Sequence, residues 1–167
     1  VYRGMITFDL SSLPSGASIV SAILELHCSS AEQTAAWNVS AHRALTQWFE
    51  GNATGTPPTG DGSTWNHRNA NGSAAWSGGA GGGAGSDYAS TPTATAAVTT
   101  INNWYSWDVT ADVAAFAAGS AANHGWWLIG QNSNGSYKAF KSSDDNLGPT
   151  LRPKLTVTYT DANVAGG

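Results

Sequence analysis

Short runs in which hydrophobic and polar residues alternate recur along the whole chain, and they constrain its fold more than any other feature. Such alternation is typical of a β-strand with one face on the core and the other in solvent. Turns rich in Gly, Pro, Asn and Ser separate the runs. The runs lie at 1–10, 19–28, 37–45, 103–109, 125–130, 137–141 and 154–159. This pattern predicts an all-β fold, an antiparallel β-sandwich or jelly roll, formed by a single domain over residues 1–167.

One run changes its period in the middle of the segment NWYSWDVTADVAAFAAG. The segment alternates like a strand up to Val109, and from there Val109, Val113 and Phe116 follow helical spacing. Thr110 is a suitable N-cap, and a carboxylate at Asp112 suits the first turn of a helix. We therefore expect a strand that continues into one short helix.

The span from residue 46 to residue 100 has almost no periodicity. It is rich in Gly, Asn, Ser and Thr, and it contains GGAGGGAGSDY at 78–88. A loop of this length is unusual in a compact domain, so we expect it to be functional or to be held in place by its aromatic residues. The glycine run lacks the Lys-Ser/Thr of a phosphate-binding loop, which predicts a flexible or surface-tracking loop.

The composition is typical of an extracellular β-protein with a neutral, hydroxyl-rich surface. Charged residues make up 11% of the chain, and the net charge is −4 with seven Lys plus Arg. This argues against nucleic acid as a partner, because nucleic-acid binding needs a basic face. No apolar run approaches the length of a membrane span. The lone cysteine, Cys28, continues an alternating run, which predicts a buried structural thiol.

Six blocks of the sequence occur in the same order as in the DNRLRE domain, and the chain resembles that family. The blocks are ITFDLSSLPSGASIVSAILELH, AHRALTQWFEG, TWN, WDVTADVAAF, NHGWWLIG and LRPKLTVTY. The resemblance implies a jelly-roll fold and a non-catalytic role beside secreted polysaccharide-degrading enzymes. The family includes members that bind alginate-like polysaccharides, and such domains also occur in surface and virion proteins.

Members of that family usually carry one or two strands upstream of the first block, whereas this sequence begins close to that block. We therefore expect one sheet edge near residues 1–10 to be filled by another chain or by the 46–100 span. Matching of the blocks also implies a structural framework. In it, Trp48, Glu50, Trp65 and Asn66 hold the long loop, while Trp107, Thr110, Phe116 and Trp126 lie in or beneath the sandwich.

The remaining tryptophans are the candidates for glycan binding, because a sugar ring stacks well on an indole. They are Trp127, Trp104, Trp37 and Trp76, with Asn102 and Asn132 as hydrogen-bonding partners. Trp127 is the foremost candidate, since Trp126 is expected to face the core. The alternative is that these tryptophans pack against the base of their own loops.

Catalysis and metal binding have weaker support. Glycosidases need two carboxylates that face each other across a cleft, and the few acidic residues are explained by caps and turns. A structural calcium has candidate ligands at Asp61, Asp87, Asp144 and Asp145. The primary hypothesis is thus an extracellular, non-catalytic polysaccharide-binding module. The alternative is a structural subunit of a virion or cell-surface assembly that neighbouring chains complete, and a polysaccharide hydrolase or lyase is the outlying third class.

Overall fold

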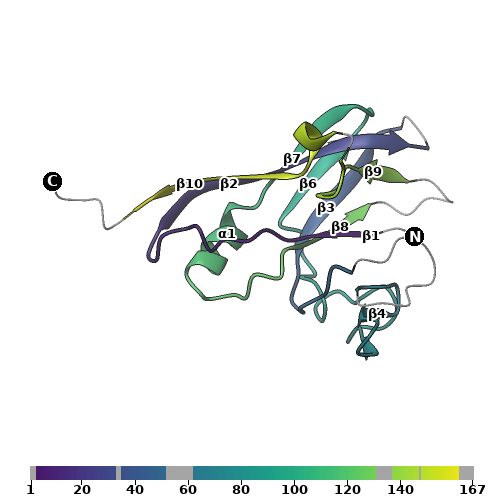
Figure 1. Cartoon of the computed structure of the whole chain (residues 1–167), viewed down its shortest axis with the longest axis horizontal. Coiled ribbons are helices and arrows are strands. Elements are labelled where there is room, and N and C mark those ends of the chain that lie inside the picture. The colour runs from purple at the N-terminus through teal and green to yellow at the C-terminus, as the bar shows by residue number, and fades with distance from the viewer. Residues whose placement is uncertain (1–2, 33–34, 52–61, 131–136, 147, 162–167) are drawn as a thin grey trace.

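The alternating runs form two antiparallel sheets that pack face to face, as Figure 1 shows. The structure is a computed structural model, and it describes residues 3–32, 35–51, 62–130, 137–146 and 148–161. The predicted all-β sandwich is confirmed. Among the described residues, no helix has the length and apolar character needed to cross a membrane.

The first sheet has the strand order β1-β8-β3-β6. Its strands are β1 (Arg3–Ile6), β8 (Trp126–Gly130), β3 (Trp37–Arg43) and β6 (Ala94–Val98). In its register Met5 lies opposite Trp127 and Ala41 lies opposite Leu128. Because side chains alternate between faces, Trp126 and Leu128 point into the sandwich while Trp127 points to the outer face.

The second sheet is organised around the long strand β2 (Ser18–Ala31). It is flanked by β10 (Lys154–Thr160) on one edge and β7 (Asn103–Asp108) on the other. The short strand β9 (Lys138–Phe140) pairs with β2 beyond the end of β10. A 3₁₀ turn, Pro149–Leu151, precedes β10.

The core lies between the sheets and contains the framework tryptophans that the sequence predicts. Trp107 is 1% exposed and Trp126 is 0% exposed. The indole Nε1 of Trp107, on the second sheet, donates a hydrogen bond to the carbonyl oxygen of Val39 on the first sheet at 2.7 Å. Phe116 packs beside Trp126, with ring centroids 5.7 Å apart. The Trp107 side chain therefore joins the two sheets, by packing in the core and by its hydrogen bond to Val39.

The predicted short helix is present as α1 (Thr110–Ala117), but its start differs from the expectation. Thr110 is not the N-cap, because the helix begins at Thr110 and Val109 occupies the cap position without a side-chain hydrogen bond. The Thr110 hydroxyl instead donates to Asp108 at 2.6 Å and accepts the backbone N–H of Ala22 at 2.9 Å. Thr110 thus ties the helix to β2.

Asp112 turns inward and is buried, although it lies in the first turn as expected. Its Oδ2 accepts hydrogen bonds from the indole of Trp126 at 2.8 Å and the hydroxyl of Thr93 at 2.6 Å. Its Oδ1 lies 3.6 Å from the guanidinium of Arg43. This carboxylate therefore joins α1 to the first sheet.

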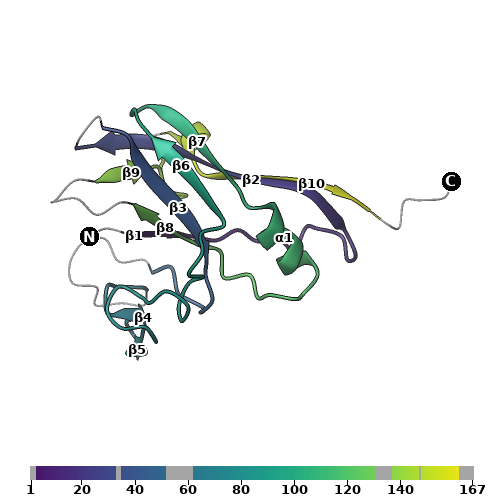
Figure 2. The same cartoon turned by 180° about the vertical axis from the view of Figure 1, so that it is seen from behind.

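The 46–100 span contains more structure than its sequence predicts. It includes a small two-stranded sheet, β4 (His67–Asn69) and β5 (Ala74–Ala75), and it ends in β6. Both Figure 1 and Figure 2 place the β4–β5 segment below the sandwich, on the side where the chain begins. The sequence of β6, ATAAV, lacks large hydrophobic residues, so its pattern does not predict a strand.

Two sheet edges lie on one side of the sandwich. The edge strands β6 and β7 follow each other in the chain and contact each other, so they lie on the same side of the sandwich. The edge strands β1 and β10 therefore lie on the opposite side. Within the described ranges, β1 pairs with β8 and β10 pairs with β2, and no strand of the 46–100 span pairs with β1. A neighbouring chain at this edge stays a prediction.

Candidate functional site

Three of the four tryptophans expected to bind a glycan are buried and so do not offer exposed stacking surfaces. Trp127 is 2% exposed, and Trp76 and Trp37 are also buried. Trp127 does point away from Trp126, as the alternation requires, but the long span covers that outer face. The expectation that Trp127, Trp76 and Trp37 offer free indole faces is therefore wrong. Asn132 lies outside the described residues, and Asn102 uses its backbone N–H to donate to the Cys28 carbonyl oxygen in the turn before β7.

A second hydrophobic cluster forms where the span meets the outer face of the first sheet. Its buried members are Ala44, Trp76, Tyr88 and Trp127. The rings of Trp76 and Trp127 meet edge to face with centroids 4.7 Å apart, and the indole of Trp76 donates to the carbonyl oxygen of Thr64 at 2.9 Å. The span is thus held by its aromatic residues, as the sequence predicts.

The glycine run is the floor on which two indoles lie. A Cβ at Gly81 would approach the ring of Trp65 to 2.6 Å, and a Cβ at Gly82 would approach the ring of Trp127 to 2.6 Å. With a Cβ at either position the facing ring would have to shift, and the positive φ values of +83 and +77 disfavour a side chain there as well. The backbone N–H of Gly81 also donates to the carbonyl oxygen of Trp65. The run follows the surface, which confirms one of the two predicted alternatives.

Trp65 combines contact with this floor and a large solvent-exposed face. It is 46% exposed, more than any other described tryptophan. The framework prediction that Trp65 packs on its own loop therefore accounts for only one side of the indole. The other framework tryptophan of the span, Trp48, donates from Nε1 to the carbonyl oxygen of His124 at 2.8 Å.

Arg3 lies at the centre of the same group of rings. Its Cζ is 5.7 Å from the ring centroid of Trp65, 5.4 Å from that of Tyr88 and 6.0 Å from that of Trp127. Its Nη1 donates to the carbonyl oxygens of Gly81 and Gly82. No carboxylate of the described residues forms an ion pair with Arg3. We call Arg3, Trp65, Gly81 and Gly82 the Trp65–Arg3 site.

Two buried N–H donors of this region have no acceptor among the described residues. They are Nε of Arg3 and Nε1 of Trp127. A buried donor without an acceptor costs about 1–3 kcal/mol, and more when the group is charged. Both atoms are enclosed by the protein, so a buried water molecule could satisfy them in place, whereas a ligand would reach them only after the surrounding groups move.

A family model described as "Disaggregatase related repeat domain" matches residues 1–157. The chain belongs to this family. The match to this disaggregatase-related repeat domain includes the first sheet, the helix, the Trp65–Arg3 site and the second sheet as far as Val157 in β10. Neither a curated protein nor a solved structure matches the chain. The matching family differs from the DNRLRE family, and the DNRLRE resemblance stays a prediction.

Trp104 is the sequence candidate that keeps part of its surface free in this disaggregatase-related repeat domain. It lies on the outer face of the second sheet, opposite His27 in the register. The Nζ of Lys154 sits 4.0 Å from its ring centroid, and the ring of His27 meets it edge-on at 5.4 Å. An ammonium group already covers one indole face, so Trp104 is less suited than Trp65 to stacking.

The calcium candidates do not come together in the disaggregatase-related repeat domain. The described residues contain no group of three His, Cys, Asp or Glu side chains suited to a metal ion. Asp61 lies outside the described residues, and Asp144 is exposed. Asp145 pairs with Lys141. Both oxygens of Asp87 accept backbone N–H groups.

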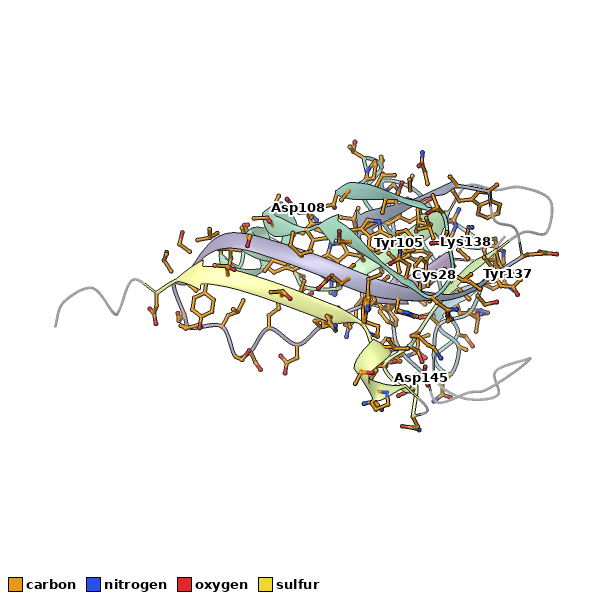
Figure 3. The ribbon with its side chains drawn as sticks, turned by 90° about the horizontal axis from the view of Figure 1, so that it is seen from above. Cys28, Tyr105, Asp108, Tyr137, Lys138 and Asp145 are labelled. Atoms are coloured by element: carbon orange, nitrogen blue, oxygen red, sulfur yellow. The ribbon has the colours of Figure 1, made fainter. Side chains whose placement is uncertain are left out.

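Cys28 and Tyr105 are among the groups with perturbed pKa values. Burial raises the pKa of the Cys28 thiol, which agrees with a structural role within the second sheet (Figure 3). The Tyr105 hydroxyl accepts the backbone N–H groups of Thr99 at 3.1 Å and Thr100 at 2.7 Å. Burial acts to raise the pKa of Tyr105, but the hydrogen bonds from Thr100 and Thr99 prevail and lower it to about 8.

Sequence reasoning missed Arg3, and a signal for it was present. The alternation that directs Ile6 and Phe8 to one face directs Arg3 and Met5 to the other. A lone arginine on the outer face of a strand suggests little by itself. Its importance follows from the glycine floor and from Trp65, which are distant in the sequence and adjacent only in the fold.

Proposed function

We propose that this chain is a non-catalytic, extracellular polysaccharide-binding module and that the Trp65–Arg3 site holds the glycan. The observation that carries the proposal is an exposed indole, Trp65, fixed beside an arginine that has no carboxylate partner in the described chain. The apolar face of a sugar ring stacks on an indole, and polar groups around the ring then give orientation.

The arginine favours a polysaccharide that carries acidic groups. A guanidinium bonds carboxylate and sulfate oxygens through charge-assisted hydrogen bonds, which are stronger than those between neutral groups. One nitrogen of Arg3 is engaged by Gly81 and Gly82, and Nε lacks an acceptor. A negatively charged substituent would supply the counter-charge that the described residues do not provide for Arg3. This agrees with what the DNRLRE resemblance implies.

A binding role fits the segment better than catalysis does. The carboxylate that the glycine segment encloses, Asp87, is 0% exposed and accepts three backbone N–H groups. It therefore cannot face a second carboxylate across a cleft, as glycoside hydrolysis requires. The family description refers to a disaggregatase, and a module that attaches to an extracellular polysaccharide is compatible with that description.

Affinity gel electrophoresis tests the proposal with one acidic and one neutral polysaccharide in parallel gels. We expect the wild-type chain to be retarded more by the acidic polymer. Trp65→Ala should weaken binding to both polymers about tenfold or more, equivalent to a loss of about 1.4 kcal/mol. Arg3→Gln should weaken binding to the acidic polymer alone, and added salt should reduce the difference.

Trp104→Ala is the matched control, because it removes a tryptophan that lies on the other sheet and carries its own cation. It should bind as the wild type does. If Trp104→Ala loses retardation while Trp65→Ala keeps it, the site is wrongly assigned. If no acidic or neutral polysaccharide in a broad panel retards the wild-type chain, the binding function is wrong.

A second candidate function is a structural role in a virion or cell-surface assembly. Among the described residues, β1 and β10 each pair on one edge only, which favours it, because an unpaired edge can accept a strand from another chain. Sedimentation of the purified chain over a wide concentration range tests this role. Concentration-dependent association that Thr158→Pro in β10 abolishes would support it, and a monomer at every concentration would count against it.

A further inference from the structure

Asp87 is a fully buried carboxylate inside the segment that supports the Trp65–Arg3 site. It is 0% exposed. Its Oδ1 accepts the backbone N–H of Ser77 at 3.0 Å, and its Oδ2 accepts those of Gly78 and Gly83, each at 2.8 Å. No arginine, lysine or histidine of the described residues forms an ion pair with it.

These three donors explain how the carboxylate can be buried without a cation. Transfer of an unpaired charge into a protein interior is costly unless hydrogen bonds replace its hydration. Backbone N–H groups directed at a carboxylate are strong, charge-assisted donors. The segment from Ser77 to Gly83 therefore wraps around Asp87, and its conformation depends on that acceptor.

The wrapped segment is the one that carries the site. Gly81 and Gly82, whose carbonyl oxygens receive Arg3, lie between Gly78 and Gly83, the two glycines that bond Asp87. At the other end, the Asp87 carbonyl oxygen accepts the backbone N–H of Leu45, which ties Asp87 to the residues after β3. Asp87 thus connects the floor of the site to the sandwich.

We infer that Asp87 is a positioning residue of the glycan site: without touching the ligand, it holds the glycine segment in the conformation that places Arg3 and Trp65 together. This inference rests on the proposed function. A segment held in its bound conformation before the ligand arrives avoids the entropic cost of ordering on binding. Asp87 accordingly raises the affinity by holding the segment in place, while Trp65 and Arg3 make the contacts with the ligand.

Asp87→Asn is the test, because it keeps the side chain's size and replaces one acceptor oxygen by an NH₂ group that faces backbone donors. We expect binding to the acidic polysaccharide to weaken about tenfold or more. Asp9→Asn is the matched control: it removes the same charge from an exposed carboxylate whose hydrogen bonds within the described residues are to Ser11, so it corrects for the altered net charge.

Hydrogen exchange separates positioning from general destabilisation. In Asp87→Asn the amides of 77–83 should exchange faster while those of β2 and β7 stay protected, and saturating polysaccharide should restore the protection. In the wild type the ligand should change these amides little. Gly79→Ala provides a second variant in case Asp87→Asn does not fold: it strains the same segment at φ +88, where a Cβ meets no atom within 4 Å.

The outcomes distinguish the two proposals. If neither the wild type nor Asp9→Asn binds any polysaccharide, the proposed function fails. If both bind and Trp65→Ala loses binding while Asp87→Asn and Gly79→Ala bind as the wild type does, the site stands and the role of Asp87 is overturned. Weakened binding with uniformly faster exchange over both sheets would also overturn it, because Asp87 would then act on the whole fold.

Discussion

Replacing Trp107 with alanine measures how much of the stability depends on the joint between the two sheets. Trp107 is 1% exposed, and truncation of a buried tryptophan to alanine costs about 3–5 kcal/mol. The substitution also removes the N–H that Val39 accepts at 2.7 Å. A domain of this size is stabilised by about 5–15 kcal/mol in total, so the variant should lose a large fraction of its stability.

The expected shift in melting temperature follows from that range. In domains of 150–250 residues, 1 kcal/mol corresponds to about 2–4 °C, so Trp107→Ala should melt about 6–20 °C below the wild type. Thermal and urea unfolding, followed by circular dichroism, measure the change. Trp107→Phe is the matched variant, because it keeps an aromatic ring against Phe140 and removes the N–H; it should lose roughly a third as much.

A melting temperature for Trp107→Ala within about 2 °C of the wild type would refute the reasoning, because a buried indole of this kind cannot be removed without cost. If the alanine and phenylalanine variants lost equal stability, the stabilisation would come from the hydrogen bond of the indole N–H, and packing of the ring would not contribute.

Three further outcomes are expected. Asp112→Ala should destabilise the domain by about 3–5 kcal/mol in urea unfolding, because it removes the acceptor of a buried network; a loss below about 1 kcal/mol would contradict this. Tyr105 should ionise with a pKa of about 8 in a phenolate absorbance titration. Because folding lowers this pKa, the extra stability that ionisation of Tyr105 adds should be absent below pH 8, rise from pH 8 to about 10 and vanish in Tyr105→Phe. Gly82→Ala should weaken polysaccharide binding, since its Cβ would lie 2.6 Å from the ring of Trp127, and unchanged binding would contradict the glycine floor.

The strands and the helix could be predicted from the sequence because each depends on local periodicity. The alternation around Leu24 and Leu26 and the change of period at Val109 report directly which face is buried. The strand β6 was missed because alanine and threonine carry too little hydrophobic contrast to show a period. Local pattern thus predicts an element only where burial differs sharply between its faces.

The sequence predicts the type of residue in the candidate site, tryptophan, but not which tryptophans are exposed. Tryptophans in and around a long polar span indicated stacking surfaces, but the choice of Trp127 assumed that the second face of its strand meets solvent. The span covers that face with Trp76 and Tyr88, and no local pattern reports a cover that comes from elsewhere in the chain. The inward turn of Asp112 has the same cause, since its partner Thr93 comes from another segment.

The glycine floor has a consequence for how the specificity of this surface could be redesigned. At Gly81 and Gly82 an added methyl group would collide with an indole, so a mutational library gains nothing from randomising them. If the Trp65–Arg3 site binds a glycan, as we propose, its recognition chemistry is confined to side chains that lie on the floor, of which Trp65 is exposed and Arg3 is half-buried. A search for altered glycan preference should therefore diversify those two positions while the backbone beneath them is left as a fixed template.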